Sequence, residues 1–438
     1  MNHQIWGVSP YPVGTGRRKM APMKKLVLAG FAAIVLVLGS LFGAVLPGNA
    51  APDPSITAGQ ILVKFRDGGA AAGVLRQHGL NDGPGVGSTG ARLITVPAGK
   101  EVQLVEALGR NPAVEYAEPD YVVTALTNDQ YFPRQYALQN DGQSFTNTDG
   151  TIKIAAGTVD ADVDAVEAWV VTKGAGIKVA VLDSGVANDN KDITQKVAAH
   201  KNFTSGETGD DNYGHGTHVS GIVAATSENT IGVAGVCPDC EILDGKVLND
   251  SGVGSSSTLA NGINWAVTSG AKVINMSLGV RASRSLETAV NNAWNNGKGA
   301  VLVAAAGNGG NTSKIYPAGY PNVIAVAATD NNDAKATFST YGASWVDIAA
   351  PGVNVYSTFP NHTFVLGTQN KRAFGYDVGN GTSMSAAIVS ATAALAWDKN
   401  RTADATDIRA KVQTSADRIA GTGTMWANGR VNAHNAVK

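Results

Sequence analysis

Residues 177–185 read Ile177-Lys-Val-Ala-Val-Leu-Asp183-Ser-Gly185, an apolar run that ends abruptly at an acid followed by two small residues. A short apolar run of this kind is typical of a strand buried inside a parallel sheet. Open α/β sheets place their functional groups at the carboxyl ends of such strands. The segment therefore predicts a parallel α/β sheet with Asp183 at its functional edge.

Two later motifs supply the partners that a carboxylate at this edge needs for nucleophilic catalysis. They are Gly214-His215-Gly-Thr-His218-Val219 and Gly381-Thr-Ser383-Met384. A serine hydroxyl becomes nucleophilic when an imidazole takes its proton, and a carboxylate holds that imidazole in the correct tautomer. The chain order Asp, His, Ser differs from the orders of the α/β-hydrolases and the chymotrypsin type. The motifs thus predict a serine hydrolase of a third fold.

A fourth motif follows the apolar run that begins at Val301, which ends in Gly307-Asn308-Gly-Gly310. An amide on such a turn is suited to donate to the negative oxygen of a tetrahedral intermediate. Each motif alone has an ordinary alternative, since strand-ending acids form turns and Gly-Thr-Ser caps helices. Their joint occurrence in this order favours the catalytic interpretation. His218 has no third ligand-type residue nearby in sequence, so we expect it to be structural rather than metal-binding.

These four motifs resemble the subtilase family of serine endopeptidases, and most closely its thermitase-like branch. The resemblance implies that Asp183 orients the imidazole, His215 is general base and then acid, and Ser383 attacks the substrate. It also implies that Asn308 and the Ser383 backbone N–H hold the oxyanion. Two other functions stay open: a catalytically impaired subtilase fold acting as a protein-binding module, and an esterase using the same triad.

The fold class expected for the catalytic part is α/β, a doubly wound and mostly parallel subtilisin-like sheet, because predicted strands and helices alternate along the chain. The predicted strands are Lys178–Asp183, Glu241–Leu248, Lys272–Leu278, Ala300–Ala306, Val323–Ala328 and Val346–Ala349. The predicted helices are Asp164–Val171, His215–Thr226, Ser257–Ser269, Ser285–Asn295, Met384–Trp397 and Ala405–Ser415.

Two further regions precede this part. Residues 1–50 are predicted as a signal peptide, because basic residues lead into an apolar run that small residues follow; a membrane anchor is the alternative. Residues 51–124 have the strand and helix pattern of a small α+β domain. They resemble the propeptide of subtilases, which acts as an inhibitor and folding chaperone. An independent ferredoxin-like binding domain is the alternative. The catalytic domain is then 125–438, and propeptide cleavage is expected within 122–127.

Composition agrees with a large globular enzyme, and the resemblance implies protein or peptide substrates. The 438 residues are 44% hydrophobic and carry a formal net charge of −1, which gives no electrostatic footprint for nucleic acid. We expect a secreted, extracellular monomer with its own propeptide as intramolecular inhibitor and no lasting membrane association once the signal is removed. The natural substrate stays open.

The resemblance also assigns the substrate cleft. It implies an exposed edge at Ser251, Gly252, Val253 and Gly254, where an extended peptide pairs through backbone hydrogen bonds. It implies a pocket for the residue before the scissile bond with two walls, formed by Ser277, Leu278, Gly279, Ala304, Ala305, Ala306 and Gly307. No Asp or Glu lies between residues 301 and 325. We therefore predict broad specificity that favours apolar or uncharged side chains.

Structural calcium is the cofactor that the thermitase-like resemblance implies. The oxygen ligands it suggests are the side chains of Asp129, Asp192 and Asn229 and the backbone carbonyls of Thr226, Ile231 and Val233. The number of ions stays open. Cys237 and Cys240 are the two cysteines of the chain, and in an exported protein they are expected to form a short disulfide; a redox or zinc role is a weaker alternative.

The helix after Ser383 departs from the family pattern. The family usually continues Ala-Thr/Ser-Pro-His-Val-Ala-Gly after the serine and methionine, whereas this chain reads Ser385-Ala-Ala387-Ile388-Val389-Ser390-Ala391. Ala387 suits a helix better than proline. Ile388 in place of histidine and Ala391 in place of glycine add bulk, and they are expected to shift Ser383 slightly. The segment 366–380 is also longer than the thermitase-like pattern. The efficiency of the nucleophile is therefore the open question.

Overall fold

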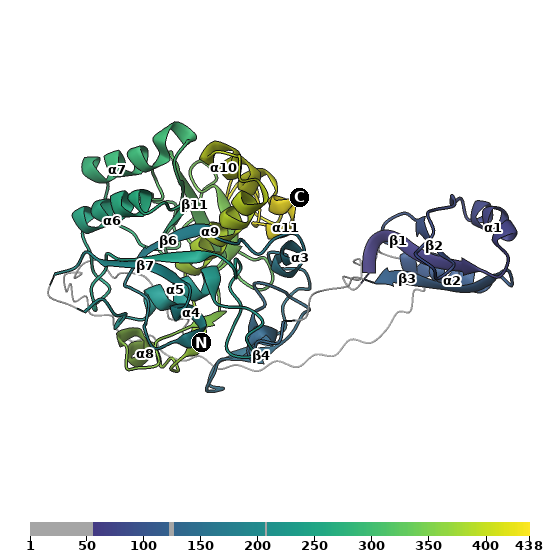
Figure 1. The fold of residues 1–438 in the computed structure, drawn as a ribbon, viewed down its shortest axis with the longest axis horizontal. Coiled ribbons are helices and arrows are strands. Elements are labelled where there is room, and N and C mark those ends of the chain that lie inside the picture. The colour runs from purple at the N-terminus through teal and green to yellow at the C-terminus, as the bar shows by residue number, and fades with distance from the viewer. Residues whose placement is uncertain (1–55, 122–126, 206–207) are drawn as a thin grey trace, which may run out of the picture. The chain divides into compact units, whose positions relative to one another are not determined.

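The computed structural model describes residues 56–121, 127–205 and 208–438 (Figure 1). The predicted signal peptide and most of the expected propeptide cleavage segment lie outside these residues. Within them the chain divides into two compact units, one on each side of residues 122–126. No helix in the described part of the chain is long and apolar enough to span a membrane.

The N-terminal unit is a small α+β domain, as its pattern predicts. Its three antiparallel strands lie in the order β2-β1-β3. Its core is apolar side chains of the sheet and of two helices, including Ile61, Leu75 and Leu108. The elements are β1 (Ile56–Phe65), α1 (Ala71–Gln77), β2 (Ala91–Thr95), α2 (Glu101–Gly109) and β3 (Val114–Tyr121).

A seven-stranded sheet organises the larger unit, and every pairing in it is parallel. The strand order is β12-β11-β10-β9-β6-β8-β7, so the chain runs from β6 to the edge strand β7, returns through β8, and then continues on the other side of β6 from β9 to β12. This reversal makes the carboxyl end of β6 a switch point, where sheets of this class form their sites. The strands are β6 (Lys178–Asp183), β7 (Val197–Asn202), β8 (Glu241–Lys246), β9 (Val273–Met276), β10 (Val301–Ala305), β11 (Val323–Thr329) and β12 (Ile348–Pro351).

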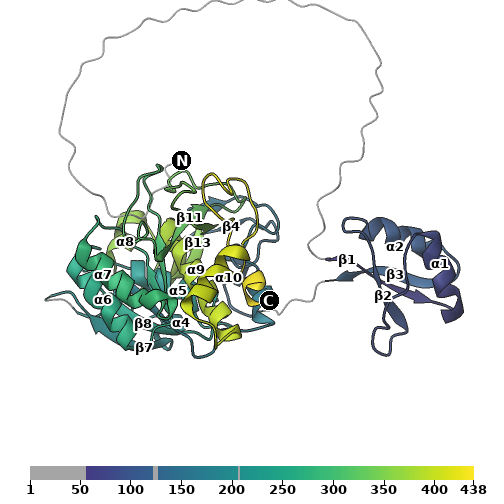
Figure 2. The ribbon, with the colours of Figure 1, turned by 90° about the horizontal axis from the view of Figure 1, so that it is seen from above.

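Helices cover both faces of this sheet (Figures 1 and 2). Alternate residues of β6 point to opposite faces: Val179 and Val181 join the core beneath α5 and α9, while Ala180 and Leu182 join the core beneath α6 and α7. The helices are α3 (Ala165–Trp169), α4 (Lys191–Thr194), α5 (His215–Ala224), α6 (Ser256–Thr268), α7 (Arg284–Trp294), α8 (Val365–Asn370), α9 (Thr382–Lys399), α10 (Ala405–Thr414) and α11 (Ala433–Val437).

The predicted doubly wound parallel architecture is confirmed, with differences at element ends. Strand β6 has the predicted limits, whereas α9 begins two residues before the predicted start, which puts Ser383 inside its first turn. The sequence pattern does not predict β7, nor an antiparallel hairpin of β13 (Val355–Thr358) and β14 (Tyr376–Gly379). This hairpin encloses the long segment before Ser383. A minor pair, β4 (Phe145–Thr146) and β5 (Lys153–Ile154), completes the unit.

Candidate active site

Asp183 and His215 form a buried pair where β6 ends and α5 begins. Asp183 Oδ1 accepts a hydrogen bond from the Ser184 backbone N–H at 2.8 Å and lies 2.8 Å from His215 Nδ1. Burial alone lowers the pKa of His215, but the charge of Asp183 and its hydrogen bond raise that pKa above its usual value. The contact at Nδ1 leaves Nε2 as the imidazole atom that can exchange a proton with a substrate or nucleophile.

The turn before His215 requires glycine. Gly214 has a φ of 96°, and a Cβ there would lie 2.3 Å from the ring of Phe364. Both the left-handed backbone and the close packing therefore exclude a larger residue. This turn directs His215, the first residue of α5, toward the end of β6.

Ser383 lies in the first turn of α9 and is 5% exposed. Its Oγ donates to the Ser277 carbonyl at 3.1 Å. The first turns of α5 and α9 meet at Gly379, because a Cβ on that glycine would lie 2.7 Å from His218 and 3.1 Å from Met384. The helix that begins with His215 and the helix that carries Ser383 therefore approach each other at their amino ends, where the peptide dipoles favour negative charge.

Asn308 is bound to the residue next to Ser383. Its Oδ1 accepts hydrogen bonds from the backbone N–H and the hydroxyl of Thr382, both at 3.0 Å. The Thr382 hydroxyl in turn accepts the Gly307 N–H at 3.1 Å. Because its oxygen end is held toward α9, the amide nitrogen of Asn308 is the end suited to donate to an oxyanion near Ser383.

Asp211 is a further residue of this site that the sequence pattern does not identify. It is fully buried, and its carboxylate accepts hydrogen bonds from the Ser184 hydroxyl, the Gly214 N–H, and the N–H and hydroxyl of Thr217. Burial raises its pKa, while these donors lower it. Asp211 thus ties the end of β6 to the first turn of α5, and its charge also raises the pKa of His215.

His218 lies in the buried interior next to the Asp183–His215 pair. Its Nε2 is 3.3 Å from the Asp377 carbonyl, and its ring packs 4.7 Å from that of Phe359. Burial, together with the nearby His215, lowers the pKa of His218 to about 3. The ring is therefore neutral at physiological pH.

The two predicted pocket walls lie on neighbouring parallel strands. Ser277, Leu278 and Gly279 follow β9, and residues 304–307 end β10. Ile315 lies between the walls, since a Cβ on Gly279 would be 1.9 Å from its Cδ1 and a Cβ on Gly307 would be 3.1 Å from its Cγ2. The sequence pattern gives no signal for Ile315, because it is brought here by a long-range contact.

The predicted cleft edge 251–254 begins in a turn that Asn249 closes. The Asn249 N–H donates to the Val253 carbonyl at 2.8 Å, and the Asn249 side chain accepts the Val253 N–H at 2.9 Å. Gly252 packs against the ring of Tyr213, because a Cβ on it would lie 2.3 Å from that ring. The turn therefore lies beside the residues that lead into His215, with the Val253 side chain 53% exposed.

The predicted calcium ligands come together around the loop 226–233. Asp129 accepts the N–H groups of Glu228 and Asn229 at 3.0 Å each, and Asp192 accepts the Val233 N–H at 2.9 Å. Burial raises the pKa of Asp192 to about 6, and the charge of Asp129 adds to the rise. Two buried carboxylates beside a loop of backbone carbonyls suit a cation with oxygen ligands.

The amide of Asn229 differs from its predicted ligand role. Its Nδ2 donates to Asp192 Oδ1 at 2.6 Å, and its Oδ1 accepts the Ile231 N–H at 2.9 Å. The nitrogen rather than the oxygen thus faces the carboxylate. An ion bound through the Asn229 side-chain oxygen requires that amide to rotate so that its oxygen faces the ion.

A separate group of acids lies at Asp160, Asp162 and Asp164, whose carboxylate oxygens are within 4.8 Å of one another. Asp162 accepts the N–H groups of Asn140 and Asp164, both at 2.7 Å. The Arg430 guanidinium donates to the Asp160 carbonyl. Protein N–H groups thus already bind the Asp162 carboxylate at the centre of this cluster.

Cys237 and Cys240 form a disulfide, as predicted. Both are buried at the end of the loop that leads into β8. The disulfide packs against Gly174, where a Cβ would lie 2.0 Å from Cys237 Sγ.

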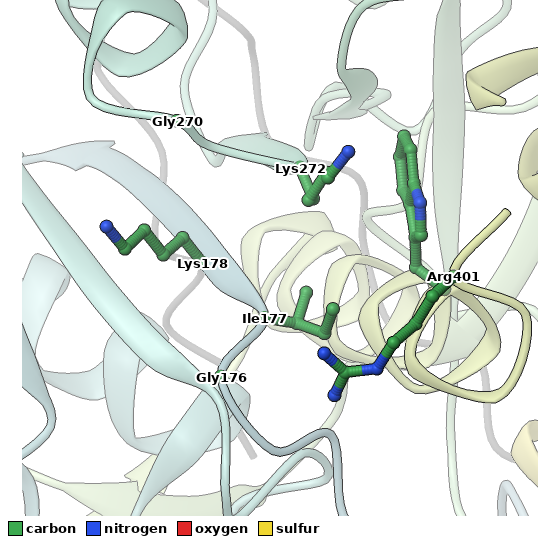
Figure 3. Close-up of a pocket in the computed structure, with 7 residues that line it drawn as sticks. Gly176, Ile177, Lys178, Gly270, Lys272 and Arg401 are labelled. Carbon is green, nitrogen blue, oxygen red and sulfur yellow. The ribbon is translucent and has the colours of Figure 1, made fainter. Parts of the chain in front are cut away.

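A hollow of about 340 Å³ opens at the opposite edge of the sheet, where β6 and β9 begin (Figure 3). Its cations do not converge, since the side chains of Lys178 and Lys272 diverge in Figure 3 and Arg401 pairs with Asp398. Lys272 Nζ lies 4.7 Å from the centre of the Trp397 ring. None of the predicted catalytic residues lines this hollow.

Comparison with known proteins agrees with the site geometry. Residues 174–433 match the model of the subtilase family, and residues 49–120 match that of the fervidolysin N-terminal prodomain. Thermitase of Thermoactinomyces vulgaris is 46% identical over 278 residues, covering 63% of this chain and 94% of its own length. A thermophilic serine proteinase of Bacillus sp. (strain AK1) is 39% identical over 388 residues, covering 86% of this chain and 87% of its own length.

Among solved structures, one described as proteases from Pseudoalteromonas arctica PAMC 21717 matches with a TM-score of 0.61 and 27% identity. That match covers 72% of this chain and 99% of the other. The parallel sheet, the site at its switch point and these similarities lead to one assignment. The chain belongs to the subtilase family of serine endopeptidases, in a thermitase-like form with an N-terminal prodomain.

Proposed function

We propose that this chain is a secreted, calcium-stabilised serine endopeptidase, made as a zymogen, that cleaves peptide bonds through Asp183, His215 and Ser383. The observation that carries the proposal is the buried Asp183–His215 contact of 2.8 Å beside the first turn of α9, where Ser383 lies. This arrangement supports proton transfer from the serine hydroxyl to the imidazole.

In the proposed mechanism, His215 Nε2 takes the proton of Ser383 as the hydroxyl oxygen attacks the substrate carbonyl. The amide nitrogen of Asn308 and the Ser383 N–H stabilise the negative oxygen that forms. His215 then gives its proton to the leaving amine, and water attacks the acyl-enzyme by the same route in reverse. Asp183 stabilises the imidazolium in both steps.

For specificity, we propose a preference for apolar or uncharged side chains before the scissile bond. Apart from Leu278, the predicted pocket walls consist of small residues, and Ile315 supplies an apolar surface between them. Positively charged substrate residues would find no compensating carboxylate in the stretch 301–325. The turn 251–254 is proposed to flank the substrate on the side of Tyr213.

For the cofactor, we propose that calcium binds between Asp129, Asp192 and the loop 226–233. The proximity of the two buried carboxylates supports this proposal, as does the raised pKa of Asp192. The ion would neutralise their charges and fix the loop; the chemistry at Ser383 does not pass through it.

For biosynthesis, we propose that residues 1–50 direct export, that 51–124 are the inhibitory propeptide, and that 125–438 form the mature enzyme, acting as a monomer. The separate compact fold of the N-terminal unit and its match to a prodomain support this division.

Two measurements separate the candidate functions. The first is casein hydrolysis by the purified chain and by its Ser383→Ala variant, and the second is labelling of the purified chain by a serine-directed phosphonate. Proteolysis that is lost in the variant supports the endopeptidase. Phosphonate labelling without proteolysis would favour an esterase. If neither occurred, a binding module would be the better description.

A further inference from the structure

The helix that carries Ser383 has hydroxyl side chains where the family pattern has alanine. Helix α9 is regular and buried from Thr382 to Trp397, so Ala387 and Ile388 fit it without interruption. Ser385 and Ser390 are the two replacements that add a hydroxyl. Each of these hydroxyls forms hydrogen bonds with another element.

The Ser390 hydroxyl begins a buried chain of hydrogen bonds that ends at the nucleophile. It donates to Asn275 Oδ1 at 3.0 Å, and Asn275 Nδ2 donates to the Ser277 hydroxyl at 3.0 Å. The Ser277 hydroxyl donates to the Ser383 carbonyl at 2.8 Å. The Ser383 Oγ returns a hydrogen bond to the Ser277 carbonyl at 3.1 Å. Ser277 thus holds the nucleophile through both its backbone and its side chain.

The direction of each bond in this chain depends on the one before it. Because Ser390 donates to the oxygen of the Asn275 amide, the nitrogen of that amide must face Ser277. The Ser277 hydroxyl then accepts from Asn275 and directs its own proton to the Ser383 carbonyl. The four side chains are almost completely buried, where competition from water is weak and such chains are strengthened.

We propose that Ser390 is a positioning residue for Ser383, acting through Asn275 and Ser277. The inference rests on the proposed role of Ser383 as the nucleophile. It also bears on the efficiency of Ser383, which the altered helix left open. The Ser390 hydroxyl departs from the family pattern, and it orients Asn275 and Ser277, which hold Ser383.

The same helix offers a matched control. Thr392 lies two residues after Ser390 in α9 and is also buried. Among the residues that the structure describes, its hydroxyl has no hydrogen-bond partner. Thr392→Val therefore removes a buried hydroxyl from α9 without touching the chain of bonds. Ser390→Ala removes a hydroxyl of similar burial that begins it.

The experiment measures kcat and KM on a peptide substrate for the mature enzyme and for Ser390→Ala, Thr392→Val, Ser277→Ala and the double variant Ser277→Ala/Ser390→Ala. Active-site titration with the phosphonate corrects each rate for unfolded or unprocessed protein. We expect Ser390→Ala to lower kcat roughly tenfold with KM unchanged, since misplacement by a fraction of an ångström affects the chemical step. Thr392→Val should leave kcat unchanged.

The double variant separates positioning from packing. If Ser390 acts through Ser277, its removal has little further effect once the Ser277 hydroxyl is gone. Equal kcat values for Ser390→Ala and Thr392→Val, or an undiminished effect of Ser390→Ala in the Ser277→Ala background, would overturn the inference. Failure of the unaltered enzyme to label at Ser383 would instead overturn the proposed function and this inference with it.

Discussion

Asp211 is a buried carboxylate that adds to the effect of Asp183 on the pKa of His215, the proposed general base. Its negative charge raises the pKa of His215, and its hydrogen bonds hold the turn at Gly214. His215 accepts a proton only when neutral, so activity rises as the pH passes upward through its pKa. A raised pKa moves that rise to higher pH.

Asp211→Asn is therefore expected to shift the acid limb of the kcat/KM profile to lower pH, because loss of the negative charge lowers the pKa of His215. Its maximal kcat should also fall, since an amide cannot accept all four hydrogen bonds. The neighbouring Asp210→Asn serves as the control and should keep the original limb. An unmoved or alkaline-shifted limb in Asp211→Asn would show that its charge does not act on His215.

Ile315 determines the size of the proposed pocket by its position between Gly279 and Gly307. Ile315→Ala is expected to raise the kcat/KM ratio for phenylalanine over alanine before the scissile bond by at least about tenfold, because the pocket gains room for several carbon atoms. Peptides that differ at that residue give the ratio. Ile152→Ala, in another apolar cluster, is the control; an unchanged ratio in Ile315→Ala would place Ile315 outside the pocket.

At the scale of elements, prediction succeeds where a local pattern decides the structure. The limits of β6 follow from its apolar run, and the motifs at Asp183, His215, Ser383 and Asn308 lie at the ends of elements that the pattern locates. Strand β7 is not predicted because it lacks a continuous apolar run. It lies at the edge of the sheet, its burial alternates, and its residues include the polar His200 and Lys201.

Most features of the site that the sequence does not predict depend on contacts between distant segments. The roles of Asp211 and Ile315 arise from neighbours far along the chain, such as Ser184 and Gly279, which no local pattern reveals. The turn at 251–254, by contrast, is set locally, by the side chain of Asn249 as well as by its glycines. Sequence thus locates the proposed catalytic groups at the ends of their elements, and the structure shows which contacts hold them.

The loop 226–233 is the element whose stability should depend on calcium. EDTA is expected to lower the melting temperature of the phosphonate-inactivated mature enzyme by several degrees, because an ion present at 100 times its Kd stabilises the folded state by about 2.7 kcal/mol. Added calcium should restore it. Asp129→Asn should melt lower and respond less to EDTA. A melting temperature unaffected by EDTA in the unaltered enzyme would remove calcium from this account.

At the scale of the whole molecule, two features support a protease with its own inhibitor. The strand order reverses beside β6, so loops from several strands meet at the carboxyl end where Asp183 lies. The chain also carries a separately folded N-terminal unit that matches a prodomain. The altered helix α9 completes the site, since its hydroxyls bind the elements beside it.

The most direct test of the central claim is the mass of the mature protein after reaction with a serine-directed phosphonate, with fragmentation to locate the adduct. We predict one adduct per molecule, on Ser383, with complete loss of casein hydrolysis. The Ser383→Ala variant should show neither adduct nor hydrolysis. An adduct on another serine, or casein hydrolysis that persists in Ser383→Ala, would contradict the account.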